Sequence, residues 1–143
     1  MNIIKEWNRY KECNQLEYVN SIYGSEYVYI IFNEFTGLHK IGITTDCYKR
    51  YSSLCTSSGV KLKIIMIIEL SPEIDLSSYY IETFLHNYFG NKRGIGEWFN
   101  LNKSDVLQIR ELFWESIMGE MIWDENVSES WVANIEDFHL NVN

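Results

Sequence analysis

A tyrosine and a lysine are predicted to lie side by side on a β-hairpin, and together they could carry out proton chemistry. Residues 26–33 and 38–43 are rich in β-branched and aromatic residues, and the turn between them ends at Gly37, which can take a positive φ. The hairpin would place Tyr29 near Lys40. An ammonium group beside a phenol lowers the pKa of the phenol, so Tyr29 could accept a proton from water.

Three further side chains have the chemistry that phosphate requires. Arg50 carries a planar guanidinium that matches a phosphate, and Glu82 carries a carboxylate suited to one Mg²⁺. His86 follows Glu82 by four residues and so shares its helix face, where it could hydrogen-bond a leaving group, orient Glu82 or bind a softer metal. Phosphodiester hydrolysis needs an activated water, stabilisation of the phosphate charge and help for the leaving oxygen.

Each of these residues also has an ordinary structural interpretation. Tyr29 could be a simple strand tyrosine and Lys40 a solvated strand lysine. Arg50 could pair with Asp46, four residues earlier on the same helix. The carboxylate and imidazole on the later helix are more often a helix-face pair than a metal site, because two ligands do not complete one.

The elements that must position these residues follow from hydrophobic periodicity and from capping signals. We expect a mixed α/β (α+β) domain with a small, mainly antiparallel, three-stranded central sheet flanked by helices, and with extra helical segments at both ends. The predicted elements are an amphipathic helix over 3–20, strands over 26–33, 38–43 and 61–70, helices over 47–55 and 75–89, a short extended piece over 97–99, and a helix from Asn102 or Ser104 to about Met118.

Three segments are expected in the domain organisation. Residues 1–23 would form the N-terminal amphipathic helix packed on the domain, 24–101 the central domain, and 102–143 a C-terminal helix followed by an acidic, tryptophan-containing segment. No apolar stretch has the length to cross a bilayer, and the N-terminus lacks a secretory pattern. We therefore expect a cytoplasmic protein with no membrane partner.

The acidic charge is concentrated near the C-terminus. The net charge is −8, and residues 102–143 hold two basic and nine acidic side chains. A protein whose whole surface binds nucleic acid should be basic, so this balance argues against a simple high-affinity DNA-binding protein. Residues 119–143 also carry Trp123 and Trp131, and we expect this segment to dock on its own domain or on a partner.

Five short motifs occur in one order along the chain and together resemble a known family. They are Tyr27-Val28-Tyr29, Lys40-Ile41-Gly42, Arg50, Glu82-Thr83-Phe84-Leu85-His86-Asn87-Tyr88-Phe89 and Gly96-Glu97-Trp98-Phe99. Over about residues 26–101 the chain resembles the GIY-YIG endonuclease superfamily, in the phage- and virus-associated branch that has Lys-Ile-Gly in place of Tyr-Ile-Gly.

The resemblance implies an endonuclease that hydrolyses DNA with one divalent metal, Mg²⁺ or Mn²⁺. It implies that Tyr29 is the general base, Lys40 its partner and Arg50 the phosphate clamp. It also implies that His86 is catalytic and that Glu82 holds the metal. The residues expected to contact nucleic acid are Tyr27, Lys49, Lys92 and Arg93.

A second function of a different class stays open. The acidic C-terminal segment favours a non-catalytic binding protein on the same fold, such as a phage or viral inhibitor of a host defence nuclease or of a nucleic-acid-binding complex. Residues 119–143 would then contact the protein partner, and the host cytoplasm would be the location.

Overall fold

The computed structural model describes residues 2–13, 26–70, 78–113, 117–124 and 127–131. Within them the chain alternates short helices and strands. The helices are α1 (Ile3–Cys13), α2 (Cys47–Ser58), α3 (Ser78–Tyr88), the 3₁₀ turn η1 (Gly90–Lys92) and α4 (Lys103–Leu112). The strands are β1 (Glu26–Asn33), β2 (Leu38–Thr44), β3 (Lys63–Leu70), β4 (Trp98–Phe99), β5 (Ile117–Asp124) and β6 (Val127–Trp131).

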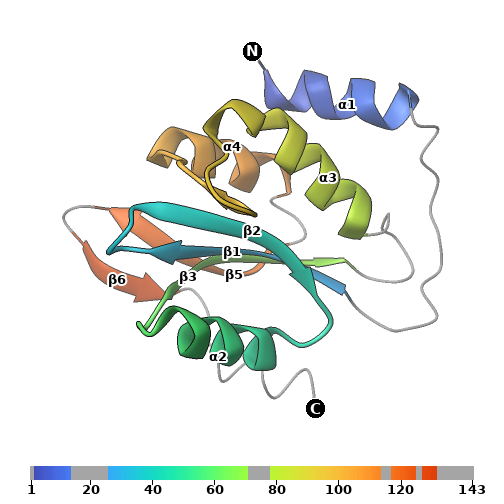
Figure 1. The fold of residues 1–143 in the computed structure, drawn as a ribbon. Coiled ribbons are helices and arrows are strands. Elements are labelled where there is room, and N and C mark those ends of the chain that lie inside the picture. The colour runs from blue at the N-terminus through green and yellow to red at the C-terminus, as the bar shows by residue number, and fades with distance from the viewer. Residues whose placement is uncertain (1, 14–25, 71–77, 114–116, 125–126, 132–143) are drawn as a thin grey trace.

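One antiparallel sheet divides the molecule into layers. The strand order is β4-β2-β1-β3-β5-β6, and every pairing is antiparallel. Helices α3 and α4 cover one face of the sheet, α1 packs on these two helices on the side away from the sheet, and α2 covers the other face (Figure 1). Both faces of the central strands are therefore buried, which explains why their sequences are apolar almost throughout.

The alternation of side chains along β1 supplies both cores. Val28 and Ile30 face the side of the sheet that α3 and α4 cover, whereas Tyr27, Tyr29 and Ile31 face α2. On the first face α1 is anchored by Trp7, whose ring meets that of Phe84 on α3 at 5.0 Å between centroids.

Local signals set the ends of the hairpin and of α2. The side chain of Asn33 accepts hydrogen bonds from the backbone of Phe35 and Thr36, and Gly37 has a φ of 74°. Asp46 caps the start of α2 by accepting from the backbone of Lys49. Because turn and cap chemistry is local, the predicted hairpin and the start of this helix agree with the structure.

The predicted fold class, a mixed α/β domain with a mainly antiparallel sheet flanked by helices, is confirmed. The three predicted strands lie side by side at the centre as β1, β2 and β3, but within the described residues the sheet has six strands rather than three.

The predicted helix to about Met118 is wrong at its end. Asn102 caps it in a reciprocal box with Asp105, but α4 ends at Leu112, and Ile117 begins β5. Apolar residues continue at helical spacing past Leu112, which favoured a longer helix. Pairing of β5 with β3 satisfies backbone groups that would otherwise lie at an open edge of the sheet.

Part of the acidic segment docks on its own sheet, because β5 pairs with β3 and β6 pairs with β5. Residues 125–126 and 132–143 lie outside the described residues, as do 14–25 of the predicted N-terminal segment. In the described part of the chain, no helix combines the length and the apolar character needed to span a bilayer.

Acid should destabilise this fold through His39, which is fully buried on β2. Burial lowers the pKa of His39 from 6.5 to about 4, although the Asp105 carboxylate acts in the opposite direction. As the pH falls from 6.5 to about 4, the His39 imidazole binds a proton in the unfolded chain but not in the folded chain. This group's contribution, fully present above pH 6.5, should therefore fall by about 3 kcal/mol across that window.

Two measurements check this expectation. Urea unfolding at a series of pH values gives the free energy of unfolding, and an NMR titration gives the pKa of the His39 imidazole directly. A His39 titration near 6.5, its ordinary value, would contradict the prediction.

Candidate functional site

The ring of Tyr29 lies over Gly42 on the neighbouring strand. The two residues are paired across β1 and β2. A Cβ atom at position 42 would come within 2.2 Å of the tyrosine oxygen and 2.4 Å of Cζ, so no side chain fits there. The glycine of the Lys-Ile-Gly motif therefore makes room for the tyrosine of the other strand.

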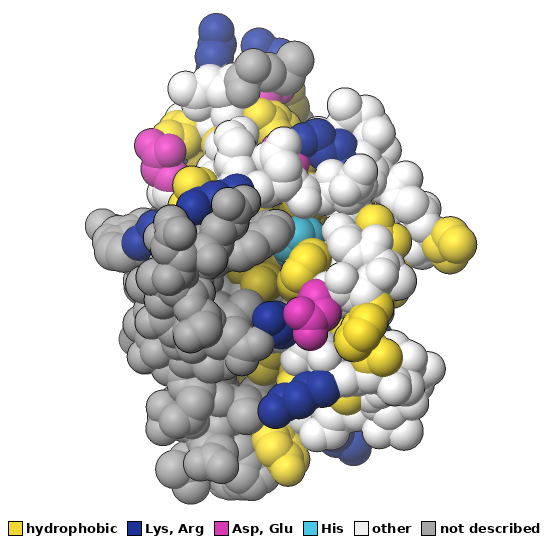
Figure 2. All heavy atoms as spheres, turned by 90° about the vertical axis from the view of Figure 1, so that its left-hand side faces the viewer, with side chains coloured by type: hydrophobic (Ala, Val, Ile, Leu, Met, Phe, Trp, Pro, Cys, Tyr) yellow, Lys and Arg dark blue, Asp and Glu magenta, His cyan; other side chains and the backbone are white. Residues whose placement is uncertain are grey.

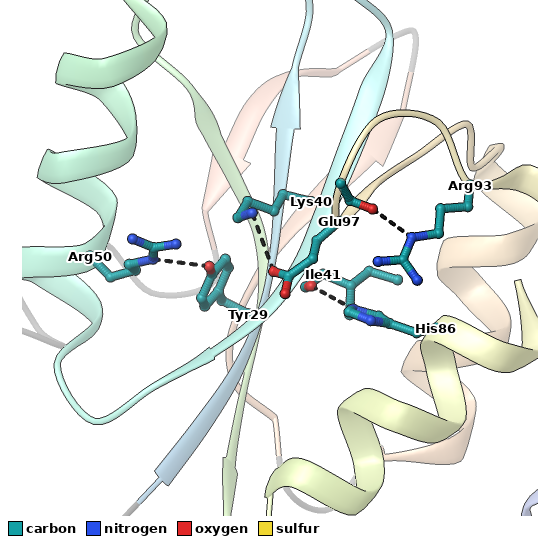
Figure 3. A network of polar contacts seen from close by, with 8 residues as sticks. Tyr29, Lys40, Ile41, Arg50, His86, Arg93 and Glu97 are labelled. Carbon is teal, nitrogen blue, oxygen red and sulfur yellow. Dashed lines mark hydrogen bonds and ion pairs between the residues drawn. The ribbon is translucent and has the colours of Figure 1, made fainter. Parts of the chain in front are cut away.

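Arg50 reaches this tyrosine from α2. Its Nε donates a 3.2 Å hydrogen bond to the hydroxyl oxygen of Tyr29 (Figure 3). The alternative partner, Asp46, caps α2 through the Lys49 backbone. Arg50 and Tyr29 border a small pocket between α2 and the sheet. Its other lining residues are Ile31, Cys47, Tyr51, Ile64 and Ile67.

The expected lowering of the Tyr29 pKa is not what the structure produces. Burial raises this pKa, and the hydrogen bond and positive charge of Arg50 lower it only in part. The carboxylates of Glu97 and Glu82 raise it further. Tyr29 is 3% exposed, so removal from water outweighs the neighbouring cation, and the phenol stays protonated at neutral pH.

Lys40 points to a carboxylate rather than to the phenol. Its Nζ lies 3.3 Å from Oε2 of Glu97, and the lysine side chain is far more buried than the glutamate. The ammonium also lies 5.7 Å from the centre of the Trp98 ring. Lys40 pairs with Trp98 across β2 and β4, which explains how the loop before β4 brings Glu97 to the lysine.

The backbone of Ile41 holds two further parts of the site. Its N–H donates to the carbonyl oxygen of Glu97 at 3.3 Å. Its carbonyl oxygen accepts a 2.9 Å hydrogen bond from Nε2 of His86 (Figure 3). A carbonyl can only accept, so Nε2 carries the hydrogen and the lone pair of a neutral His86 ring lies on Nδ1.

Glu82, His86 and Glu97 converge. One ligand atom from each lies within 4.8 Å of the others, and all three side chains are half-buried. Burial raises the pKa of Glu82; the charge of His86 lowers it, Glu97 raises it, and Lys40 and Arg93 lower it. Two carboxylates and an imidazole are donors that divalent cations accept, so the residues present fit a metal ion.

The four residues expected to contact nucleic acid occupy different environments. Tyr27 is 4% exposed and packs in the core beneath α2, which favours a packing role. Lys49 is exposed on α2. Lys92 forms an ion pair with Asp105. Arg93 is exposed and donates from Nε to the carbonyl of Gly96.

Basic, acidic and histidine side chains lie close together on one face of the molecule, among hydrophobic side chains (Figure 2). The described parts of the site thus form a continuous group. It runs from Arg50 and Tyr29 on the α2 side, through Lys40 and Glu97 at the edge, to Glu82 and His86 on α3.

Sequence reasoning missed two of these residues. From the sequence, Glu97 was named only within the motif Gly96-Glu97-Trp98-Phe99, yet it contacts Lys40 and joins the carboxylate–imidazole cluster. Gly42 was given no role, yet Tyr29 requires it. A charged residue at the centre of Gly96-Glu97-Trp98-Phe99, between a glycine turn and a buried pair, was the available signal for Glu97.

A family comparison covers the whole of this group. The model of the T5orf172 domain matches residues 26–114, more than half of the chain. The chain belongs to the T5orf172 domain family. No curated protein and no solved structure matches the chain.

The T5orf172 domain occurs in phage proteins and is associated with GIY-YIG-like endonucleases. The expected kinship with phage nuclease-like, DNA-binding domains is confirmed at that level. The matched T5orf172 segment begins with β1 and ends after α4. It therefore contains every residue of the site. The predicted division of the chain into residues 1–23, 24–101 and 102–143 stays a prediction.

Replacing Gly42 with alanine should disturb the site from within. The new methyl group would overlap the Tyr29 ring, so we expect a loss of about 1–3 kcal/mol in the free energy of unfolding and displacement of the ring from Arg50. Urea unfolding and the chemical shifts of the Tyr29 ring measure both effects.

Gly90→Ala is the matched control, because a Cβ atom there meets nothing within 4 Å. It should change stability by about 0.5 kcal/mol or less. Equal stability of the two variants would contradict the close packing of Tyr29 on Gly42.

Proposed function

We propose that this T5orf172 domain is an endonuclease of the GIY-YIG type, which hydrolyses DNA phosphodiester bonds with a divalent metal, Mg²⁺ or Mn²⁺. The observation that carries the proposal is the contact of Arg50 with Tyr29 beside the Lys40–Glu97 pair and the Glu82–His86 helix face. These residues come from four elements and from the loop before β4, and they meet at one edge of the sheet.

Arg50 would bind the scissile phosphate. Its Nε is used by Tyr29, which orients the guanidinium and leaves its remaining N–H groups as donors for phosphate oxygens. Positioned donors stabilise the charge that develops on the phosphate in the transition state. Arg50 is half-buried next to a pocket, where such electrostatic contacts are stronger than in bulk water.

Tyr29 would act mainly as a hydrogen-bonding group. Its oxygen accepts from Arg50, so its own proton stays available for a water molecule or a phosphate oxygen. Serving as a general base would require loss of that proton, and burial opposes this step by raising the pKa. A cation bound at this edge would favour ionisation of the phenol, because a nearby positive charge stabilises the phenolate.

Glu82 would hold the metal ion, as the family resemblance implies. A bound divalent cation supplies Lewis-acid stabilisation of the phosphate and lowers the pKa of a coordinated water. Lys40 keeps Glu97 in place beside it through the 3.3 Å ion pair. Exposed cations such as Lys49 and Arg93 would contact the DNA backbone away from the reacting bond.

Cleavage assays test the proposal. Single- and double-stranded DNA should be cut by the wild-type chain in the presence of Mg²⁺ or Mn²⁺. Arg50→Ala should reduce the rate about 100-fold or more because it removes a transition-state donor. Glu82→Ala should remove the metal-dependent activity.

Arg9→Ala is the matched control, since Arg9 is a well-exposed arginine on α1. It should cut DNA at the wild-type rate. Activity that survives both Arg50→Ala and Glu82→Ala would exclude this site as the catalytic centre.

A second candidate is a non-catalytic binding protein on the same fold. It is favoured by the buried, protonated phenol of Tyr29 and by the engagement of Lys40 with Glu97. Under this hypothesis neither metal supports cleavage, and a host protein binds through the acidic side chains of residues 119–143. Affinity capture should retain that protein on the wild-type chain and lose it when those acidic residues are replaced by amides. Cleavage without a retained protein would exclude this candidate.

A further inference from the structure

We propose that Glu82, His86 and Glu97 together form one site for a first-row transition-metal cation such as Mn²⁺, which they bind in preference to Mg²⁺. The proposal rests on the proposed function in that it places the nuclease metal. It goes further by adding two ligands to Glu82 and by naming the class of metal.

The three groups already lie at the spacing of a ligand set. Their ligand atoms fall within 4.8 Å of one another although they come from α3 and from the loop before β4. Two carboxylates so close together repel each other, and the Lys40 ammonium beside Glu97 offsets part of that repulsion. A cation among the three groups would remove that repulsion and gain three bonds.

The imidazole decides which metals are preferred. Mg²⁺ binds oxygen ligands in an octahedral shell and keeps several waters, and it gains little from nitrogen. Imidazole nitrogen suits first-row transition metals, whose affinity for mixed nitrogen and oxygen sites begins with Mn²⁺ and rises along the row. A histidine between two carboxylates therefore shifts selectivity away from Mg²⁺.

Ile41 positions two of the three ligands before any metal arrives. Its carbonyl accepts the hydrogen of His86 Nε2 at 2.9 Å, and its N–H binds the carbonyl of Glu97 at 3.3 Å. Metal-binding histidines usually donate their second ring N–H to a carbonyl or carboxylate, which sets the tautomer and the ring orientation. His86 has this arrangement, with the lone pair on Nδ1.

Lys40 orients the third ligand. It contacts Oε2 of Glu97, and a carboxylate has a second oxygen with lone pairs for a cation. Glu97 can thus bind a metal through one oxygen while the other stays with the lysine. This arrangement avoids leaving the buried Lys40 ammonium without a counter-charge.

Isothermal titration of the full chain with MnCl₂ and with MgCl₂, without DNA, measures the site directly. We expect one Mn²⁺ per chain, bound about tenfold or more tightly than Mg²⁺. Glu97→Gln should weaken Mn²⁺ binding about tenfold or more. Glu111→Gln is the matched control, because it makes the same change at an exposed position of α4 and should bind Mn²⁺ as the wild type does.

His86→Gln tests the role of nitrogen. Glutamine keeps a donor for the Ile41 carbonyl but offers an amide oxygen to the metal. Mn²⁺ affinity should therefore fall more than Mg²⁺ affinity, and the gap between the two metals should narrow. Equal affinity of the wild-type chain for both metals, or equal Mn²⁺ affinity of Glu97→Gln and Glu111→Gln, would overturn the proposal.

A measurement on the unmutated chain covers the case in which a variant does not fold. Substoichiometric Mn²⁺ should broaden the NMR signals of residues 82, 86 and 97 before those of other residues; broadening centred elsewhere would overturn the site. Mn²⁺ binding at these residues without DNA cleavage would refute the nuclease and leave the metal site standing. Metal-dependent cleavage that Glu97→Gln does not affect would refute the three-ligand metal site and leave the nuclease proposal standing.

Discussion

The contact between the Tyr29 ring and Gly42 is the constraint on which the rest of the site depends. The ring can lie across β2 only because the paired residue has no side chain. From that position the hydroxyl meets Arg50 of α2. Lys40 lies two residues before Gly42 on the same strand and therefore faces the same side of the sheet. A shift of one residue in the pairing of β2 with β1 would turn Lys40 and Gly42 away from α2.

The edge of the sheet at β2 has a second role. Among the described residues, the outer side of this strand pairs with a strand of two residues, β4. The backbone of Ile41 is therefore available to the carbonyl of Glu97 and to the imidazole of His86. Groups from opposite layers of the molecule meet there, since α2 and α3 lie on different faces of the sheet (Figure 1). A long outer strand would occupy these backbone groups and keep the layers apart.

Sequence reasoning succeeded where the information is local. Asn33 and Asp46 accept hydrogen bonds from backbone groups a few residues away, and Gly37 takes a positive φ in the turn. The hairpin and the start of α2 could therefore be predicted from the types and order of neighbouring residues. The pKa of Tyr29 depends on burial by residues that are distant in sequence. The cluster of Glu82, His86 and Glu97 depends on the pairing of β2 with β4. The end of α4 depends in the same way on the free side of β3, which lies far back along the chain.

The strand order also sets the distance between the site and the strands that follow α4. Strands β5 and β6 lie on the opposite side of β1 and β3 from β2. Three strand spacings separate β2 from β5, roughly 14 Å, and the Debye length at physiological ionic strength is about 8 Å. An anion that approaches β2 is therefore more than one Debye length from the backbone of β5. Such an anion meets a local balance set by Arg50, Lys40 and Arg93 against Glu82 and Glu97, a field that the net charge of −8 does not describe.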